Sequence, residues 1–332
     1  MESLRLRFVS GPDIESLALE RREILEAVEG CVRAQGQGHV VLEPRVHLTP
    51  PGGRGHFNVL RGHLEPQQVS GVKVVGDFVD NYKVGLPSEL ALINLLDPHT
   101  GAPLAVLDGT FITEVRTGAL TAIGARHLAR PGSKVLGHIG ARGTAWWNVV
   151  FLDELFDFDE IRVTSRRPAS RESFAERLSE ELGKHVRAVA TPQECLEGAD
   201  VMVEASRLTE PTVLLRTEWV APGTLVVPYG TISAVELDLL DVMDKVVVDD
   251  WGQARAGPFG ALRRHVDSGR LTRESLHAEL GDIVAGTAAG RESDSERILF
   301  WHRGLSTTDI AVAHLILRRA EKADAGTVLR YR

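Results

Sequence analysis

The sequence has few of the features that mark specialised classes of protein. Its 332 residues include only two cysteines, Cys31 and Cys195, which are far apart and do not suggest a disulfide framework or a cysteine-based zinc site. No metal site is expected. Acidic residues outnumber basic ones, and the net charge of −8 argues against nucleic-acid binding, which needs a basic face.

Long apolar runs are also absent. No segment reaches the ~18 consecutive apolar residues of a membrane span, so no membrane partner is expected. Residues 1–20 lack the apolar core of a signal peptide, which favours a cytoplasmic protein. The hydrophobic fraction of 43% and the charged fraction of 25% are ordinary for a soluble globular protein, and the chain is long enough for two domains.

The N-terminal third is predicted to be rich in strand. Residues 4–10 alternate in polarity before Gly11-Pro12 and predict an edge strand, and residues 13–36 have the spacing of one or two helices. Further strands are expected over residues 39–64 (two strands joined by a Pro/Gly loop), 69–79, 88–97 and 103–113.

From residue 114 onward, predicted helices and strands alternate. A helix from 114 stops at Pro131-Gly132, and a last helix is expected over 306–323. Between them, strands are expected over 134–140, 160–166, 185–191, 200–206, 224–230 and 245–250, with helices over 144–156, 170–183 and 192–199. This alternation predicts an α/β fold with a doubly wound parallel sheet, which binds ligands beyond the carboxyl ends of its strands.

The segment "GHIGARGTA" (137–145) follows a predicted strand and opens a predicted helix, which is the context of a dinucleotide-binding turn. Gly140 suits the tight turn, and Gly143 allows the backbone to approach a pyrophosphate at the helix N-terminus. Arg142 stands where the standard pattern has its second glycine, so it either blocks that approach or contacts a phosphate itself. A glycine-rich turn without a ligand is the alternative.

The tip of the next predicted strand carries Ser165, Arg166 and Arg167 and no carboxylate. A carboxylate at this place would bond the ribose hydroxyls and repel a 2′-phosphate, whereas a guanidinium pairs with phosphate. The sequence therefore favours NADP(H), with NAD(H) as a second possibility. The alternative is a solvated charged face.

The chain resembles the ornithine cyclodeaminase/mu-crystallin family over about residues 40–320. The segments that carry the resemblance include "EPRVHL", "SGVKVVG", "TGAPLAVLDGTFITEVRTGALTA", "GHIGARGTA", "VVPYGTISAVELD" and "FWHRGLSTTDIAVAHL". The resemblance implies a homodimer of two-domain subunits. Residues 1–118 with 305–332 would form an α+β domain for substrate binding and dimerisation, and residues 119–304 a Rossmann-type domain.

The resemblance also implies hydride transfer between a nicotinamide and the α-carbon of an amino or imino acid. Arg45, Lys73 and Arg116 match the substrate-pocket positions, where cations would hold the substrate carboxylate. Lys73 would also handle a proton, because burial lowers the pKa of a lysine. Surface or structural salt bridges are the alternative. The residues expected at the cofactor are Thr117, Gly140, Arg142, Gly143, Thr144, Ala145, Ser165, Arg166, Arg167, Ser206, Tyr229 and Gly304.

The sequence departs from the family pattern at two places. Cyclodeaminases of the family carry an aspartate at the position of Gly230, which puts ornithine cyclisation in doubt. His302 stands where relatives commonly have serine, and it would either supply a proton to an imine or only form a structural hydrogen bond. Near it, Ser306 and Asp309 are expected first to cap the last helix, with a cofactor contact as Asp309's second possibility.

The main hypothesis is therefore an NADP(H)-dependent oxidoreductase that acts on the C–N bond of an amino acid or its cyclic imine. One alternative is a cyclodeaminase that recycles a bound NAD(H). The other is an NADPH-dependent ligand-binding protein of mu-crystallin type.

Overall fold

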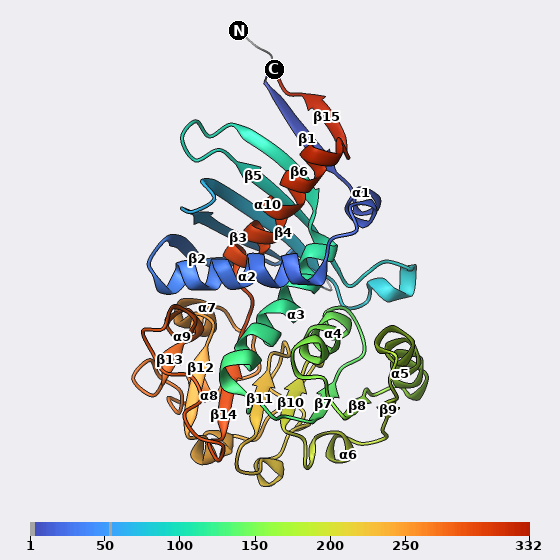
Figure 1. Cartoon of the computed structure of the whole chain (residues 1–332), viewed down its shortest axis with the longest axis vertical. Coiled ribbons are helices and arrows are strands. Elements are labelled where there is room, and N and C mark those ends of the chain that lie inside the picture. The colour runs from blue at the N-terminus through green and yellow to red at the C-terminus, as the bar shows by residue number, and fades with distance from the viewer. Residues whose placement is uncertain (1–3, 53–54) are drawn as a thin grey trace. The chain divides into compact units, whose positions relative to one another are not determined.

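The computed structural model describes residues 4–52 and 55–332 (Figure 1). Gly53 and Arg54 of the predicted Pro/Gly loop lie outside this range. The chain forms two compact units, one of residues 1–116 with 304–332 and one of residues 117–303. The boundary between the units falls within helix α3 (Gly109–Leu128).

The first unit is built on a seven-stranded mixed sheet of order β15-β1-β6-β5-β4-β3-β2. Its strands are β1 (Arg5–Val9), β2 (Val40–Leu48), β3 (His56–Leu64), β4 (Val69–Asp77), β5 (Glu89–Leu96), β6 (Pro103–Asp108) and β15 (Thr327–Arg330). β1 was expected at the edge, and this was wrong: β15 pairs antiparallel on one side of β1, and β6 pairs parallel on the other. No sequence rule links strands more than 300 residues apart.

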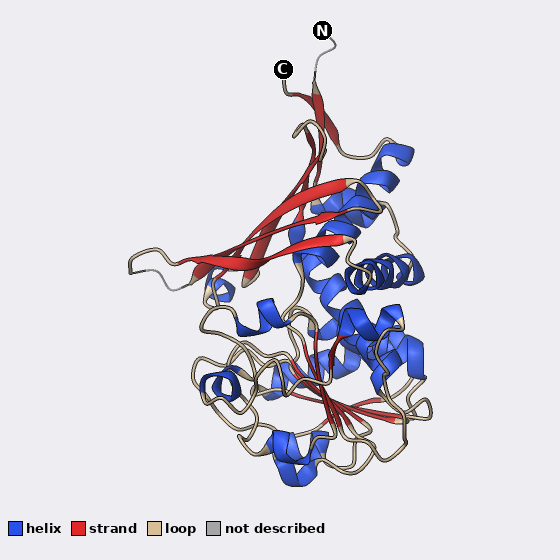
Figure 2. Cartoon of the chain, turned by 90° about the vertical axis from the view of Figure 1, so that its left-hand side faces the viewer, coloured by secondary structure: helices blue, strands red, loops and turns tan. Residues whose placement is uncertain are grey.

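Helices cover one face of this sheet. They are α1 (Gly11–Ser16), α2 (Arg21–Gly36) and α10 (Ser306–Ala323), with the short 3-10 helix η1 (Asn81–Val84) in a loop. Figure 2 shows α2 and α10 on the same side of the strands, and α10 packs on α2, β3, β4 and β5. Gly62 and Gly71 are paired across β3 and β4, and a Cβ at either would crowd α10 (2.7 Å from Ile310 at Gly71). These glycines allow α10 to approach the sheet closely.

The second unit contains an eight-stranded sheet of order β13-β12-β14-β11-β10-β7-β8-β9, in which every pairing is parallel. The predicted doubly wound sheet is confirmed. Every residue of its β10, β11, β12 and β14 is buried, as expected of a parallel sheet covered on both faces. The strands are β7 (Val135–Ile139), β8 (Glu160–Thr164), β9 (Val186–Ala188), β10 (Val201–Glu204), β11 (Leu225–Pro228), β12 (Lys245–Val248), β13 (Ala278–Glu279) and β14 (Ile298–Trp301).

Short helices connect these strands. They are α4 (Ala145–Phe156), α5 (Pro168–Leu182), α6 (Pro192–Leu196), α7 (Trp251–Arg255), α8 (Arg263–Asp267), α9 (Leu280–Ala285) and the 3-10 helices η2 (Thr217–Trp219) and η3 (Leu239–Val242). Of the helices within residues 4–52 and 55–332, none is both long enough and apolar enough to cross a membrane.

One predicted strand ends earlier than expected. Residues 103–113 were expected to be extended, but the strand stops at Asp108 and α3 starts at Gly109. The Asp108 carboxylate accepts a hydrogen bond of 2.9 Å from the Thr110 backbone N–H, which satisfies a donor of the first helical turn. The β-branched residues that follow favour a strand locally, and this capping bond together with burial of the helix overrides them.

Candidate functional site

A lysine occupies the buried face of β4. Side chains alternate along this strand, so that Lys73 is 1% exposed while its neighbour Val74 is 37% exposed. This inverts the usual arrangement, because lysine is almost never fully buried unless it is paired. Lys73 Nζ donates hydrogen bonds to Asp309 Oδ1 at 2.8 Å and to Thr113 Oγ1 at 2.7 Å.

Asp309 is the anion of this cluster and not a helix cap. The N-cap of α10 is Leu305, which makes no side-chain capping bond, and the Ser306 hydroxyl donates to the Arg61 carbonyl at 2.7 Å. Asp309 is completely buried, and its Oδ1 also accepts from Arg116 Nε at 2.8 Å. The expected capping role was therefore wrong, because two buried cations hold this carboxylate.

Gly304 lies between the two arginines predicted for the substrate pocket. Arg45 donates from Nη2 to the Gly304 carbonyl at 2.8 Å. Gly304 has φ +79°, and a Cβ there would collide with the Arg116 guanidinium. Both its backbone conformation and the arginine thus require glycine at 304. Arg45, Lys73 and Arg116 are in this way joined through Gly304 and Asp309 within the first unit.

Burial and the neighbouring charges shift the pKa values of this cluster in opposite directions. Burial lowers the pKa of Lys73 to about 8, against the effect of Asp309, which favours the charged lysine. Burial acts to raise the pKa of Asp309, but Arg116 and Lys73 together hold it below its usual value. Asp309 therefore stays ionised near neutral pH. The pKa of Lys73 is close enough to neutral pH for this side chain to exchange a proton.

The glycine turn of the second unit joins β7 to α4. Gly140 has φ +122°, and a Cβ there would lie 2.9 Å from the Ala205 carbonyl oxygen. Gly143 has φ +55°, and Arg142 is exposed. Thr144 is the N-cap residue and Ala145 the first residue of α4. This turn gives a helix of 12 residues an accessible N-terminus, the arrangement that accepts a pyrophosphate.

Ser165, Arg166 and Arg167 follow the carboxyl end of β8. Both arginines are exposed, and Arg167 is the N-cap residue of α5. The Ser165 hydroxyl donates to the Arg167 carbonyl at 3.3 Å. Both charges therefore lie at the carboxyl end of β8, which is the neighbour of β7 in the sheet.

Polar side chains also gather after β11 and β14. The Tyr229 hydroxyl is within hydrogen-bond distance of Thr144 Oγ1 (2.9 Å) and accepts from Asn148 Nδ2 (2.9 Å). Its ring stacks on His302, with centroids 4.8 Å apart. His302 is 1% exposed, and its Nε2 lies 2.9 Å from Thr121 Oγ1. The Thr121 hydroxyl also donates to the Thr117 carbonyl at 3.2 Å, which connects this group to α3.

Sequence reasoning missed Glu204, the last residue of β10. Ser206 holds its Oε1 through the backbone N–H at 2.8 Å and through the hydroxyl. Burial raises the pKa of Glu204 to about 7. A carboxylate at the end of a wholly apolar strand was the available signal, since an acid is rarely placed there for packing.

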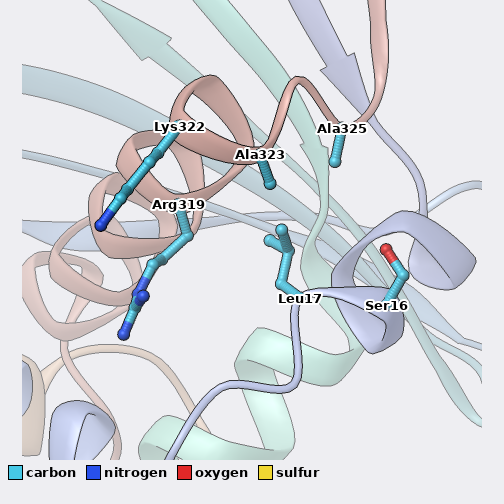
Figure 3. A pocket seen from close by; sticks show the side chains of 6 residues that line it. All are labelled: Ser16, Leu17, Arg319, Lys322, Ala323 and Ala325. Carbon is cyan, nitrogen blue, oxygen red and sulfur yellow. The ribbon is translucent and has the colours of Figure 1, made fainter.

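The pocket drawn in Figure 3 lies elsewhere in the first unit. Its volume is about 490 Å³, and it is lined by the end of α1 and by Arg319 and Lys322 of α10. None of the predicted site residues lines it, and Arg319 makes an ion pair with Glu23. This surface pocket is therefore not the site that was predicted from the sequence.

The chain is similar to known proteins over nearly its whole length. The model of the ornithine cyclodeaminase/mu-crystallin family matches residues 8–324. An alanine dehydrogenase from Archaeoglobus fulgidus is 32% identical over 96% of each chain. A Delta(1)-pyrroline-2-carboxylate reductase from Bacillus cereus is 30% identical over 80% of this chain and 82% of its own. The structure of a Thermococcus litoralis Delta(1)-pyrroline-2-carboxylate reductase with NADH and L-proline superposes with a TM-score of 0.90 at 31% identity, covering 97% of this chain and 99% of that one.

Proposed function

Because the chain belongs to the ornithine cyclodeaminase/mu-crystallin family, we propose that it is an NADP(H)-dependent oxidoreductase acting on the C–N bond of an amino acid or its cyclic imine. The relatives described above are an amino-acid dehydrogenase and an imine reductase. The observation that carries the proposal is the pair of buried cations, Lys73 and Arg116, that share the carboxylate of Asp309, with the half-buried Arg45 bound to the nearby Gly304 carbonyl. Positive charge exceeds negative charge in this cluster, which suits an anionic substrate.

The substrate carboxylate is proposed to bind to Arg116 and Arg45. Arg116 uses Nε for Asp309, so its terminal nitrogens would form the bidentate contact. Lys73, fixed by Thr113 and Asp309, would exchange a proton with the substrate nitrogen. His302 is the other candidate for that proton, and its ring is held in place by Tyr229 and Thr121.

The residues of the second unit fit a nicotinamide dinucleotide. Gly140 and Gly143, both with positive φ, form the turn before α4, whose N-terminus would bind the pyrophosphate, with Thr144, Ala145 and Arg142 beside it. Thr117, Ser206 and Tyr229 of this unit are proposed at the nicotinamide half, as is Gly304 of the first unit. When bound, the nicotinamide ring supplies or accepts the hydride at the substrate α-carbon.

A preference for NADP(H) over NAD(H) is proposed from the end of β8. Ser165, Arg166 and Arg167 offer donors and positive charge where NAD-specific folds place a carboxylate. An exposed guanidinium pairs with a 2′-phosphate through parallel hydrogen bonds.

The proposal is tested by mixing the protein with NADPH and cyclic α-imino acids. The absorbance of the reduced nicotinamide should fall in proportion to the amino acid formed. Binding of NADPH and the imino acid without turnover would instead favour a ligand-binding protein of mu-crystallin type, and no binding of either would refute the proposal.

A cyclodeaminase is the second candidate, because a carboxylate is present beside Gly230 after all. A Cβ at Gly230 would lie 2.6 Å from Glu204 Oε2. Glu204 therefore puts a carboxylate close to the position where cyclodeaminases of the family carry their aspartate. This candidate predicts release of ammonia from a diamino acid with no net change in nicotinamide absorbance.

A homodimer through the open face of the first sheet is also proposed. This face carries exposed apolar side chains on three strands, and the archaeal alanine dehydrogenase that superposes with a TM-score of 0.91 is a dimer. The exposed residues are Val41, Val46, Leu48, Val74, Leu90 and Leu92. Leu92→Glu should shift the protein from dimer to monomer in analytical ultracentrifugation, whereas an unchanged dimer would exclude this face.

A further inference from the structure

Glu204 has a buried carboxylate oxygen that the described chain does not satisfy. The side chain is 0% exposed, and Ser206 donates only to Oε1. Within residues 4–52 and 55–332, Oε2 has no hydrogen-bond partner. Burying such an oxygen is costly unless it serves a bound partner, since nearly all buried polar atoms are paired.

The free oxygen faces Gly230. A Cβ built on Gly230 would lie 2.6 Å from Oε2 and 3.0 Å from Oε1, so any side chain at 230 would displace the carboxylate. The backbone N–H of Gly230 donates to the Glu204 carbonyl at 3.2 Å, which holds this loop against the end of β10. The absence of a side chain at residue 230 thus makes room for the Glu204 carboxylate at the carboxyl ends of β10 and β11.

The carboxyl ends of these strands would line the nicotinamide half of the proposed cofactor site, so the inference rests on the proposed function. The strand order reverses between β7 and β10, where a dinucleotide crosses the sheet. With the adenosine half on the side of the glycine turn and β8, as proposed above, the side of β10 and β11 would be left for the nicotinamide. We propose that Glu204 recognises the charge of the nicotinamide ring, and that its carboxylate favours the oxidised, positively charged ring over the reduced, neutral ring.

The same residue then links cofactor binding to protons. Burial raises the pKa of Glu204 to about 7, so its charge changes near neutral pH. The titratable or charged side chains nearest to it along the sheet are His138 on β7, Tyr229 after β11 and Arg207 in the loop after β10, and His302 stacks on Tyr229. Burial lowers the pKa of His138 to about 4, which keeps that residue neutral. Below pH about 7, binding of the oxidised cofactor should release a proton from Glu204, and binding of the reduced cofactor should not.

The test measures the Kd of NADP⁺ and of NADPH by calorimetry between pH about 6 and about 8.5. The ratio of the two constants removes the titration of the 2′-phosphate, which both forms share. In the wild type, Kd(NADP⁺)/Kd(NADPH) should fall by about tenfold as the pH rises, which is the limit for one group with a pKa of about 7 and is equivalent to ~1.4 kcal/mol. In Glu204→Gln the ratio should stay, over the whole pH range, near the value that the wild type has at pH about 6.

Glu210→Gln is the matched control, because it removes the same charge from an exposed position on the loop that follows β10, and it should behave as the wild type. A Glu204→Gln ratio that follows the wild type would overturn the inference. If that variant does not fold, the number of protons released when the wild type binds each cofactor tests the inference instead. Equal proton release for NADP⁺ and NADPH would overturn the inference. Failure of the wild type to bind either cofactor would instead refute the proposed function.

Discussion

The substitution Asp309→Asn tests whether one carboxylate balances the buried cations. Asparagine has nearly the same shape but no charge, so it leaves Lys73 and Arg116 without their shared anion. Removing one partner of a buried ion pair costs ~3–5 kcal/mol, because the remaining charge stays desolvated. We expect a loss of about this size in the free energy of unfolding at pH about 7.

Part of that loss should be relieved by deprotonation of Lys73. Asp309 opposes the lowering of the Lys73 pKa by burial, so without it the pKa should fall below its present value of about 8. A lysine with a folded pKa below its usual value binds fewer protons in the folded state. Unfolding free energy therefore rises with pH between about 8 and about 10.5 in the wild type, and this rise should begin at lower pH in Asp309→Asn.

The assay is urea denaturation of the wild type, Asp309→Asn, Lys73→Met and the double variant, followed by circular dichroism across this pH range. Lys73→Met should abolish the pH-dependent rise, and Asp309→Asn should cost less in its background because one cation fewer is left unpaired. A loss below ~0.5 kcal/mol in Asp309→Asn, or the same loss in both backgrounds, would refute the proposed charge balance.

Three further outcomes follow from the site. Replacing Arg166 and Arg167 together with alanine should raise the KM for NADPH at least about tenfold and leave the KM for NADH nearly unchanged, since lost phosphate contacts affect only NADPH. Equal changes of the two KM values in steady-state kinetics would contradict the role of these arginines. Lys73→Met should abolish turnover while cofactor Kd, measured by fluorescence, stays the same, and full activity would remove Lys73 from the mechanism. Gly304→Ala should raise the KM for substrate and lower the free energy of unfolding by ~1–3 kcal/mol, because φ +79° is strained for alanine and its methyl group would collide with Arg116. An unchanged KM would place Arg116 outside the substrate pocket.

Much of the second unit was predictable because its rules are local. Strands and helices alternate along the sequence, and parallel strands joined by helices fold into one kind of sheet. The glycine turn was identified from its place between a strand and a helix. β14 was not identified as a strand, since Ile298–Trp301 is a short apolar run whose periodicity does not distinguish strand from helix.

Asp309 shows what local patterns miss. Its position in the first turn of α10 is typical of a capping acid, but its partners Arg116 and Lys73 lie 193 and 236 residues away in the sequence. Only the packing of α10 on β4 brings these charges together. Lys73 and Arg116 were found through the resemblance to a family, and their roles in substrate binding stay predictions.

The central claim is that the reduced cofactor delivers its hydrogen to the α-carbon of an imino acid. It is tested most directly with NADPH that carries deuterium on the transferred position of C4 and a cyclic imino acid as substrate, with the product analysed by mass spectrometry. The account predicts one deuterium at the α-carbon of the amino acid for each NADPH oxidised. An amino-acid product without deuterium, or oxidation of NADPH without that product, would contradict it.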